Sequence, residues 1–312
     1  MPYIRKKFIE ILEKAIEDGK KMTREEKLFT YDGVVYPTTL CSSQLFKALE
    51  SFEARSDDVI LAAYCKTGTN WVGQIVTDLV ITSAKKHEPH KLNEELLLAE
   101  FPFLEIGDLE KYKRMKTYPS RRVIFTHLRA DKLPKSVFKN KAKILLLVRN
   151  PKDVAASFFH FSNTFAAYPP YETFGPFFEA LMKGEVPWGS YIDFLCVWNK
   201  YIDEENVMLI TYEELKENTA LGAKKIAKFF ELNLSEEDIQ GVAERSTFKT
   251  MKDHSKKTHG EFGDVLFRKG TVSDWKTLFS QENNQEMDMA FKERLAGTKV
   301  GEMIKYDIYC KA

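Results

Sequence analysis

The chain has few cysteines and no long hydrophobic run. Its four cysteines are widely separated and form no CxxC pair, a spacing typical of a reduced intracellular protein. It does not suggest a disulfide-stapled or zinc-cysteine scaffold. The longest apolar runs, 59–65 and 144–148, are far shorter than the roughly 20 residues that cross a bilayer. The sequence therefore predicts a cytoplasmic protein without a membrane-spanning segment.

An excess of charge of one sign is also missing. The 47 basic residues nearly balance the 46 acidic ones, which leaves a formal net charge of +1. Without an overall positive field, the chain is not expected to bind nucleic acid or a membrane surface. Any site for an anion must therefore be built locally.

Linkers and repeats are absent as well, which predicts a single domain over residues 1–312. Charges are spread throughout the N-terminus, while Phe8, Leu12, Ala15 and Ile16 fall on one helical face. We interpret this segment as a docking helix within about residues 1–50, and not as a signal peptide. A core of about residues 52–305 would follow.

Short apolar runs alternate with helical patterns over most of the chain. This order predicts a three-layer α/β/α fold around a central parallel sheet. Ligands in such sheets bind beyond the carboxyl ends of the strands. That rule places Lys66, His127, Arg149 and Tyr212 along one edge. The expected strands are 59–64, 122–126, 143–148 and 207–211.

Two stretches interrupt the alternation. Residues 158–178 combine many aromatic residues with three prolines, and residues 249–270 are basic. We expect both to be irregular loops, which in α/β enzymes often carry function.

The segment 59–81 is the most informative. An apolar run ends at Cys65, a short polar loop follows, and an amphipathic helix begins near Trp71. Unpaired N–H groups and the helix dipole make such a helix start an anion site. Lys66 adds a charge, Gly68 allows close backbone approach, and the remaining loop side chains add donors. Those side chains are Thr67, Thr69 and Asn70.

A second cation lies at the expected end of the strand 143–148. Arg149 is followed by Asn150 as a helix N-cap, Pro151 in the first turn and Asp153 two residues later. Arg149 could therefore bind an anion with Ser157 further along the helix. It could equally form an ion pair with a carboxylate while Ser157 packs against a neighbouring helix.

Of the six histidines, His127 alone directly follows an expected strand. A neutral imidazole there could take a proton from a hydroxyl nucleophile. A loop histidine bonded to backbone is the alternative. His87 and His90 have metal-like spacing, but Pro89 breaks the helix and no further ligands cluster there, so no metal is expected.

The segment RKGTVSDWK offers a further anion site. Arg268 can fork around a phosphate, Lys269 adds a charge and Gly270 allows backbone approach. Trp71 and Phe248 offer flat faces for a purine, although such aromatics are more often core residues. Together these features favour a nucleotide with two separated anionic groups.

The fingerprint of P-loop nucleoside triphosphatases, G-x-x-x-x-G-K-[ST], is missing. The strand that should supply a Mg²⁺ carboxylate ends instead in Arg149. A sulfuryl group carries less charge than a phosphoryl group, so lysine, histidine and a helix dipole could serve it without a metal.

Four ordered segments resemble the cytosolic sulfotransferases. YCKTGTNW resembles their 5′-phosphosulfate loop, usually YPKSGTTW, and LLLVRNPKDVAASFFHF resembles their 3′-phosphate segment. ITYEELKEN and FRKGTVSDWK resemble two further blocks. The similarity is colinear from about Phe52 to the C-terminus, and THGEFGDVLFRKG looks most like the family 6B branch.

The resemblance implies a sulfotransferase fold related to the P-loop fold, with 3′-phosphoadenosine 5′-phosphosulfate (PAPS) as donor. His127 would be the general base, Lys66 would stabilise the leaving phosphate, and Ser157 would restrain Lys66. The implied nucleotide-binding residues are Lys66, Thr67, Gly68, Thr69, Asn70, Trp71, Arg149, Ser157, Tyr212, Ser246, Thr247, Phe248, Phe267, Arg268, Lys269 and Gly270.

The chain departs from the family pattern at four places. Phe125 stands where a lysine is frequent, Cys65 replaces a proline, and Ser273 replaces a glycine. Ser280–Gln281 replaces the Thr-Val of the usual dimer motif, which predicts a monomer or weak homodimer.

Aromatic residues suggest an apolar pocket for a small phenol, flat alcohol or amine. The candidates are Phe103, Phe125, Phe159 and Phe161. Two alternatives remain open from the sequence. One is a nucleotide kinase on the same fold, and the other is a low-activity protein that binds a nucleotide or an apolar ligand.

Overall fold

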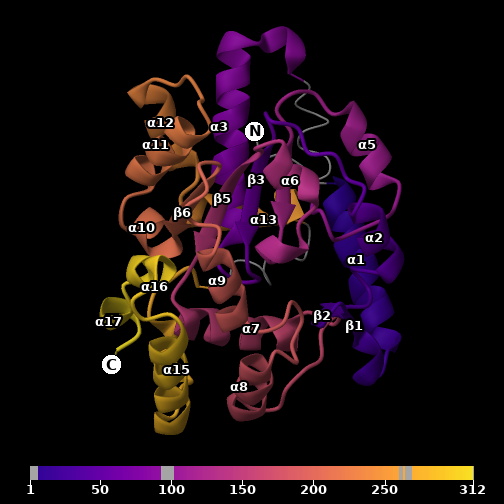
Figure 1. Cartoon of the computed structure of the whole chain (residues 1–312), viewed down its shortest axis with the longest axis vertical. Helices are drawn as coiled ribbons and strands as arrows, with labels where there is room; N and C mark the ends of the chain where they lie inside the picture. Colours follow the sequence, from indigo (N-terminus) through magenta and orange to yellow (C-terminus); the bar gives the residue numbers. More distant parts are fainter. Residues whose placement is uncertain (1–5, 93–101, 260–262, 264–268, 312) are drawn as a thin grey trace.

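The computed structural model describes residues 6–92, 102–259, 263 and 269–311. Helices and strands alternate through the chain (Figure 1). In order, the elements are α1 (Lys6–Lys21), β1 (Leu28–Tyr31), β2 (Val34–Pro37), α2 (Ser43–Leu49), β3 (Val59–Ala63), α3 (Thr69–His87), α5 (Lys111–Thr117), β4 (Val123–Thr126), α6 (Lys135–Lys139), β5 (Lys143–Val148), α7 (Pro151–Thr164), α8 (Phe174–Lys183), α9 (Tyr191–Asn199), β6 (Val207–Thr211), α10 (Tyr212–Glu217), α11 (Thr219–Phe229), α12 (Glu236–Arg245), α13 (Phe248–His259), α15 (Gln281–Arg294), α16 (Lys299–Ile304) and α17 (Tyr306–Tyr309).

The centre of the fold is a parallel four-stranded sheet in the order β4-β3-β5-β6. All four strands occur where the sequence predicts them. β3 is buried at every position, as expected of an internal strand covered on both faces. The chain passes from β3 to β4 on one side and then to β5 on the other. β3 therefore marks the point where the strand order reverses, which is where ligands bind in such sheets.

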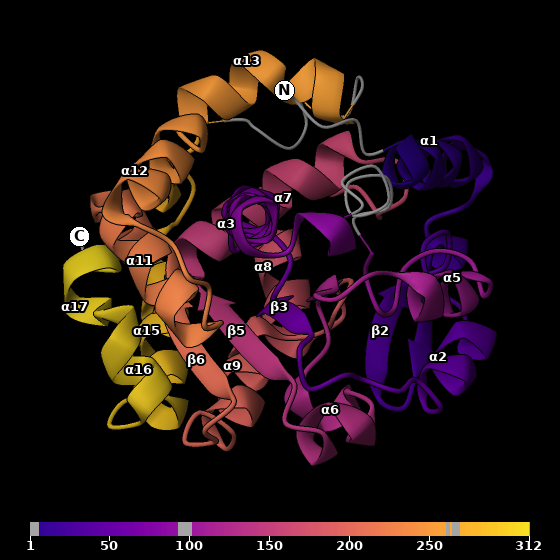
Figure 2. The ribbon, with the colours of Figure 1, turned by 90° about the horizontal axis from the view of Figure 1, so that it is seen from above.

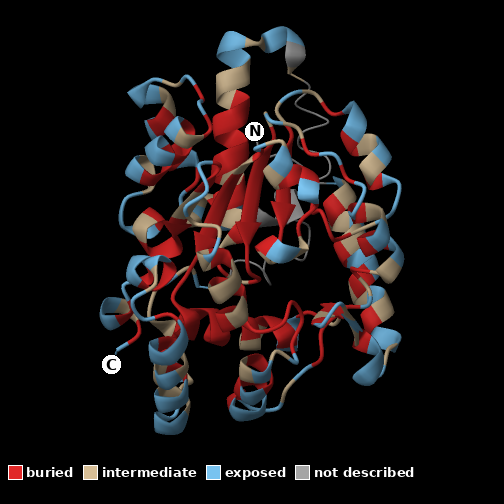
Figure 3. Cartoon of the chain, viewed as in Figure 1, coloured by how far each residue is buried: buried red, intermediate tan, exposed pale blue. Residues whose placement is uncertain are grey.

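Helices cover both faces of this sheet, which confirms the three-layer expectation. α3 contacts β3 and β4 and packs against α11 and α12, while α16 contacts β6 and α9. Seen from above, α3 lies on one side of the strands, and α9 and α16 lie on the other (Figure 2). The strands are almost wholly buried and the outer helix faces are exposed (Figure 3).

The N-terminal region differs from a simple docking helix. The expected helix is confirmed as α1, with Phe8, Leu12 and Ala15 buried. It is followed by an antiparallel hairpin of β1 and β2, and then by α2. Asp32 and Gly33 both have positive φ at the hairpin turn. An Asp-Gly pair between β-prone runs is a strong sequence signal for such a hairpin.

Both stretches expected to be irregular contain helices, so those predictions were wrong in part. α7 continues to Thr164 and α8 begins at Phe174, which leaves only 165–173 between them. Pro176 lies in the first turn of α8, where proline is tolerated. Residues 248–259 form α13. Among the described helices, none is both long and apolar enough to span a bilayer.

Candidate functional site

A cavity of about 230 Å³ lies at the carboxyl ends of the sheet strands. Lys66, His127, Arg149 and Tyr212 all line it, although they come from four separate segments. The prediction that these residues share one edge is therefore confirmed. We call the part around the Lys66 loop and Arg149 the polar part, and the part lined by Phe8, Phe103, Phe161 and Trp188 the aromatic part.

The anion loop, residues 65–70, connects β3 to α3. Lys66 and Gly68 both have left-handed φ, at 69° and 109°, which turns the chain sharply into the helix. A Cβ on Gly68 would lie 2.7 Å from the Tyr212 ring, so this glycine accommodates an aromatic neighbour. Thr67 is buried, and its hydroxyl donates to the Tyr64 carbonyl (2.8 Å), so its side chain stabilises the loop from within.

The Lys66 ammonium lies 4.1 Å from the centre of the Phe161 ring. Both residues line the cavity, and Phe161 is a buried residue of α7. A cation over an aromatic face is attracted to the ring quadrupole. The charge of Lys66 is thus placed where the polar and aromatic parts of the cavity meet.

Arg149 joins three segments. Its guanidinium donates to the Lys66 carbonyl (3.3 Å) and to the Thr271 carbonyl (3.0 Å), and it lies over the Tyr212 ring at 4.4 Å. It also approaches Asp153 at 3.5 Å. The sequence left open whether Arg149 faces an anion site or pairs with a carboxylate. In the structure it does both, because it lines the cavity and lies beside Asp153.

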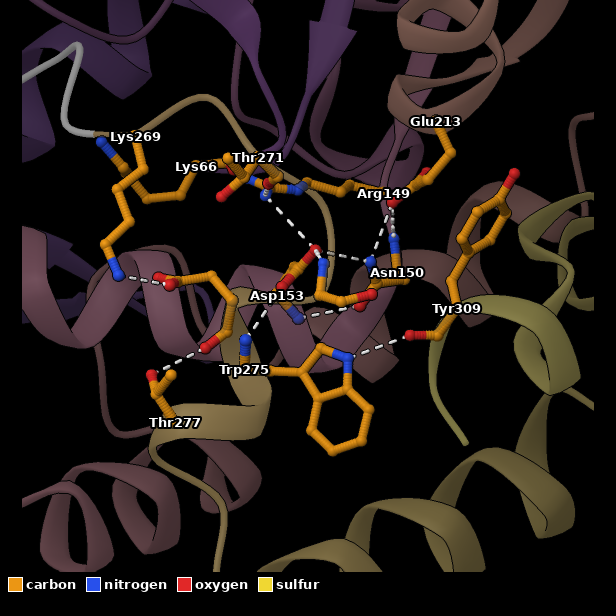
Figure 4. A network of polar contacts seen from close by, with 12 residues as sticks. Lys66, Arg149, Asn150, Asp153, Glu213, Lys269, Thr271, Trp275, Thr277 and Tyr309 are labelled. Carbon is orange, nitrogen blue, oxygen red and sulfur yellow. Dashed lines mark hydrogen bonds and ion pairs between the residues drawn. The ribbon is translucent and has the colours of Figure 1, made fainter. Parts of the chain in front are cut away.

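Asp153 organises the surrounding polar network (Figure 4). Its buried carboxylate accepts N–H bonds from Ser273 (2.8 Å) and Trp275 (3.1 Å), together with a side-chain bond from Asn150 (2.9 Å). The Trp275 indole donates in turn to the Tyr309 carbonyl (2.9 Å). One carboxylate therefore ties the start of α7 to the segment that follows Gly270.

Gly270, which precedes that segment, lies against the start of α13, and Trp71 of α3 lies close to Ser246, the C-cap residue of α12. A Cβ on Gly270 would meet the Phe248 ring at 2.3 Å, so only glycine allows this contact. Trp71 is fixed by a bond from its indole N–H to the Ser246 carbonyl (2.7 Å). The Lys216 ammonium lies 5.8 Å from the Trp71 ring and 5.5 Å from the Phe248 ring.

Several polar atoms around the anion loop have no hydrogen-bond partner among the described residues, although they are buried. They are Thr69 Oγ1, Asn70 Oδ1, Arg149 Nε and Ser246 Oγ. Buried polar groups are normally paired, so such a cluster is informative. Lys269 also lines the cavity, with its ammonium 2.5 Å from Asp274. The two hydroxyls, Arg149 Nε and the cations fit a ligand rich in anionic oxygens, whereas the amide oxygen of Asn70 can only accept a hydrogen bond.

His127 is held in one tautomer. Its Nδ1 lies 2.6 Å from the Ala63 carbonyl oxygen, which can only accept, so Nδ1 carries the proton. Nε2 is left as the proton acceptor. Burial lowers the pKa of His127 to about 4, and the charge of Lys66 lowers it too, against the opposite effect of the Ala63 bond. The imidazole is therefore neutral at pH 7.

A buried carboxylate fixes the turn that carries His127. Glu105 accepts the His127 backbone N–H (2.6 Å) and the Thr126 hydroxyl (2.8 Å). Burial raises the pKa of Glu105, and burial lowers the pKa of the neighbouring Lys111. Glu105 thus acts on His127 by holding its backbone in place.

Most expected site residues line this cavity, and some do not. Trp71, Ser157, Phe103 and Phe161 are part of the lining. Phe125 is 1% exposed and packs beneath Phe103, so it does not reach the cavity mouth as the sequence suggested. The other expected residues outside the lining are Thr67, Phe159, Ser246 and Thr247. Phe267 and Arg268 lie outside the described residues.

Phe159 is turned away because it packs against Phe174 and Phe177 of α8. Thr247 is exposed and bonds within the first turn of α13. His87 donates to the Asn233 carbonyl at 2.8 Å, and within the described residues no group of three or more His, Cys, Asp or Glu side chains could hold a metal.

Sequence reasoning missed several residues of the site. Lys216, Asp274 and Trp188 line the cavity, as do Phe8 and Leu12 of α1. The amphipathic pattern of α1 was recognised, but a buried face does not reveal what it covers. Nothing local in the sequence marks the others.

The strand-loop-helix anion site and the aromatic lining of the same cavity are the features that the sequence leads us to expect of a sulfotransferase. A family model described as "Sulfotransferase domain" matches residues 56–299. The chain therefore belongs to the sulfotransferase family and is a sulfotransferase, as its sequence suggested.

The relatives agree with this assignment. The chain is 50% identical to mouse "Sulfotransferase 6B1" over 308 residues, which cover 99% of each chain. It is 40% identical to the zebrafish protein of that name, over 95% of this chain and 98% of the other. These matches confirm the expected 6B branch.

A solved structure shares the fold. The crystal structure titled mouse sulfotransferase SULT7A1 complexed with PAP is 30% identical and has a TM-score of 0.76. The match covers 90% of this chain and 99% of that one.

Ser273 provides a stability test, because it has left-handed φ (69°) where the family usually has glycine. We expect Ser273→Gly to relieve strain and raise the free energy of unfolding by about 1 kcal/mol, with a small rise in Tm. Calorimetry measures the change. Ser280→Gly is the matched control, since Ser280 has φ −72° and caps α15, and it should lower Tm slightly. A lower Tm for Ser273→Gly would contradict the strain argument.

Proposed function

We propose that the enzyme transfers a sulfuryl group from PAPS to a hydroxyl or amine of a small, largely apolar acceptor, and that one domain carries both binding sites. The observation that supports this most is the division of one cavity. Its polar part holds a helix N-terminus and cations, its other part is aromatic, and Lys66 and His127 lie between them. Family membership argues against the kinase and non-catalytic alternatives.

The donor fits the polar part of the cavity. The anion loop, which includes Asn70, and the start of α3 would hold the 5′-phosphosulfate, with the buried Thr69 hydroxyl as a donor. Arg149, Ser157 and the 268–270 segment would hold the 3′-phosphate. The adenine ring would lie between Trp71 and Phe248. The SULT7A1 structure, whose title names PAP, supports this donor class.

The transfer step follows from the placement of two side chains. Nε2 of His127 would accept the acceptor's hydroxyl proton while the oxygen attacks sulfur. The bond from sulfur to the phosphate oxygen breaks, and 3′-phosphoadenosine 5′-phosphate leaves. Lys66 would stabilise the charge that develops on the leaving oxygen. Phe161 keeps this ammonium close to the reacting region before that charge forms.

The acceptor would occupy the aromatic part, as a phenol or a steroid-like or thyroid-hormone-like compound. Phe103 lies 4.8 Å and Trp188 5.0 Å from the His127 ring, so a flat acceptor would lie beside the base. Such chemistry suits xenobiotic or hormone conjugation. Cytoplasmic location is part of the proposal and is supported by four free cysteines.

Replacement of His127 tests its role as the base. We expect His127→Ala to reduce transfer to a phenol by about 10²–10⁴-fold, because the variant loses the imidazole that takes the proton. Binding of 3′-phosphoadenosine 5′-phosphate, measured by calorimetry, should remain. His87→Ala is the control, since His87 lies at the exposed end of α3 and should leave both quantities unchanged. Normal turnover in His127→Ala would refute the assignment of the base.

The pH dependence of kcat/KM tests the protonation state of His127. An ordinary imidazole becomes charged below about pH 6.5 and then cannot accept a proton. Because burial lowers the pKa of His127 to about 4, kcat/KM should stay level from pH 8 to about 5 and fall near pH 4. Samples returned to pH 7 must regain activity, which excludes acid unfolding. An acid limb near pH 6.5 would contradict a buried, neutral base.

We also propose that the protein is a monomer or a weak homodimer, because Ser280–Gln281 replaces the Thr-Val of the family dimer motif. In the structure Ser280 instead caps α15 by accepting the Asn283 N–H (3.2 Å).

Sedimentation at micromolar concentration should therefore show mainly monomer. The double variant Ser280→Thr with Gln281→Val should shift it toward dimer, and threonine can still cap the helix. A wild-type protein that remains dimeric on dilution would show that the substitution does not decide assembly.

A further inference from the structure

We propose that α1 forms the far wall of the acceptor pocket and that Phe8 and Leu12 limit the size of the acceptor. This inference rests on the proposed use of the aromatic part of the cavity. α1 precedes residues 56–299, the part of the chain that the sulfotransferase domain model matches.

Two side chains of α1 reach the cavity. Phe8 and Leu12 are one helical turn apart, each is 5% exposed, and both line the same cavity as Lys66 and His127. They are therefore buried against the cavity and its wall, and not against solvent. An acceptor that extended further from His127 would meet them.

A row of rings connects α1 to the base. Phe8 stacks on Phe103 with ring centres 5.9 Å apart and an angle of 17°. Phe103 lies 4.8 Å from the His127 ring. The helix is thus separated from the proton acceptor by a single aromatic side chain. The position of α1 therefore sets how far an acceptor can extend from His127.

The C-terminal half of α1 is fixed. A Cβ on Gly19 would lie 2.5 Å from the Ala166 carbonyl oxygen, so the helix backbone packs directly on the 166–167 backbone. After the helix, the buried ammonium of Lys27 donates to the same carbonyl (2.8 Å). Neighbouring Phe165 and Tyr168 also line the cavity. α1 is therefore anchored to another part of the pocket wall.

The first turns of α1 also border empty space on a second side. A small second cavity of about 10 Å³ lies there, lined in part by Ile11, Gly107 and Lys111. Phe8 and Phe103 border both cavities. Phe8 and Phe103 therefore separate the two cavities, whereas Leu12 borders only the larger one, so shortening Leu12 adds space to the larger cavity.

The test compares a one-ring phenol, 4-nitrophenol, with a four-ring phenol, 1-hydroxypyrene. In Leu12→Ala and Phe8→Ala, the ratio of kcat/KM for the large phenol to that for the small one should rise at least about tenfold, because lost side-chain volume becomes pocket space. Ile16→Ala is the matched control. Ile16 is one turn further along α1, is half-buried and does not line the cavity. Its ratio should stay at the wild-type value.

Binding provides a second measurement that needs no transfer. The fluorescence of 1-hydroxypyrene should show tighter binding to Leu12→Ala than to wild type, with both proteins saturated in 3′-phosphoadenosine 5′-phosphate. If wild type sulfates neither phenol, the proposed acceptor class fails, while this titration still decides the role of α1. The inference would be overturned if Leu12→Ala had the Tm of wild type and changed neither the kcat/KM ratio of the two phenols nor the binding of 1-hydroxypyrene. Equal losses for both phenols would also overturn it.

Discussion

The buried carboxylate of Asp153 is the constraint on which the donor side of the cavity depends. It lies in the first turn of α7, where helix N–H groups and the adjacent Arg149 favour a negative charge. From there it accepts two backbone N–H groups of the 273–275 segment. A residue 120 positions away along the chain is thereby fixed beside the end of β5. Without that carboxylate, Arg149 would be a buried cation without its counter-ion, and the late segment would lose its anchor.

The cavity is lined by several cationic side chains and by the neutral imidazole of His127, and the two kinds of group have separate effects. Lys66, Arg149, Lys216 and Lys269 surround the donor region, yet the chain as a whole is nearly neutral. His127 stays uncharged because protein encloses it and Lys66 lies nearby. Lys66 thus disfavours a second cation at His127 and favours an anion in the cavity. The proposed transfer step uses this combination of a neutral imidazole and a nearby cation.

Much of this arrangement could be predicted from the sequence. Apolar strand runs, the Asn150–Pro151 helix start and the loop at Lys66 are local signals, and each identified its element correctly. Side-chain direction was harder to predict. Phe125 and Phe159 are aromatic and close in sequence to site residues, but strand alternation turns Phe125 into the core and helix rotation turns the half-buried Phe159 toward α8. The contribution of α1 could not be predicted, because it depends on how the N-terminal helix docks against distant segments.

The packing of residues 309–310 has a consequence for the network around Asp153. The Tyr309 carbonyl accepts the Trp275 indole N–H, and the Cys310 carbonyl accepts the Lys152 ammonium (2.6 Å). These two neighbouring carbonyls therefore bind residues on either side of Asp153, one on α7 and one on the segment that Asp153 holds. A substitution that displaced residues 309–310 would loosen α7 and the Trp275 segment together, although neither change touches the sheet.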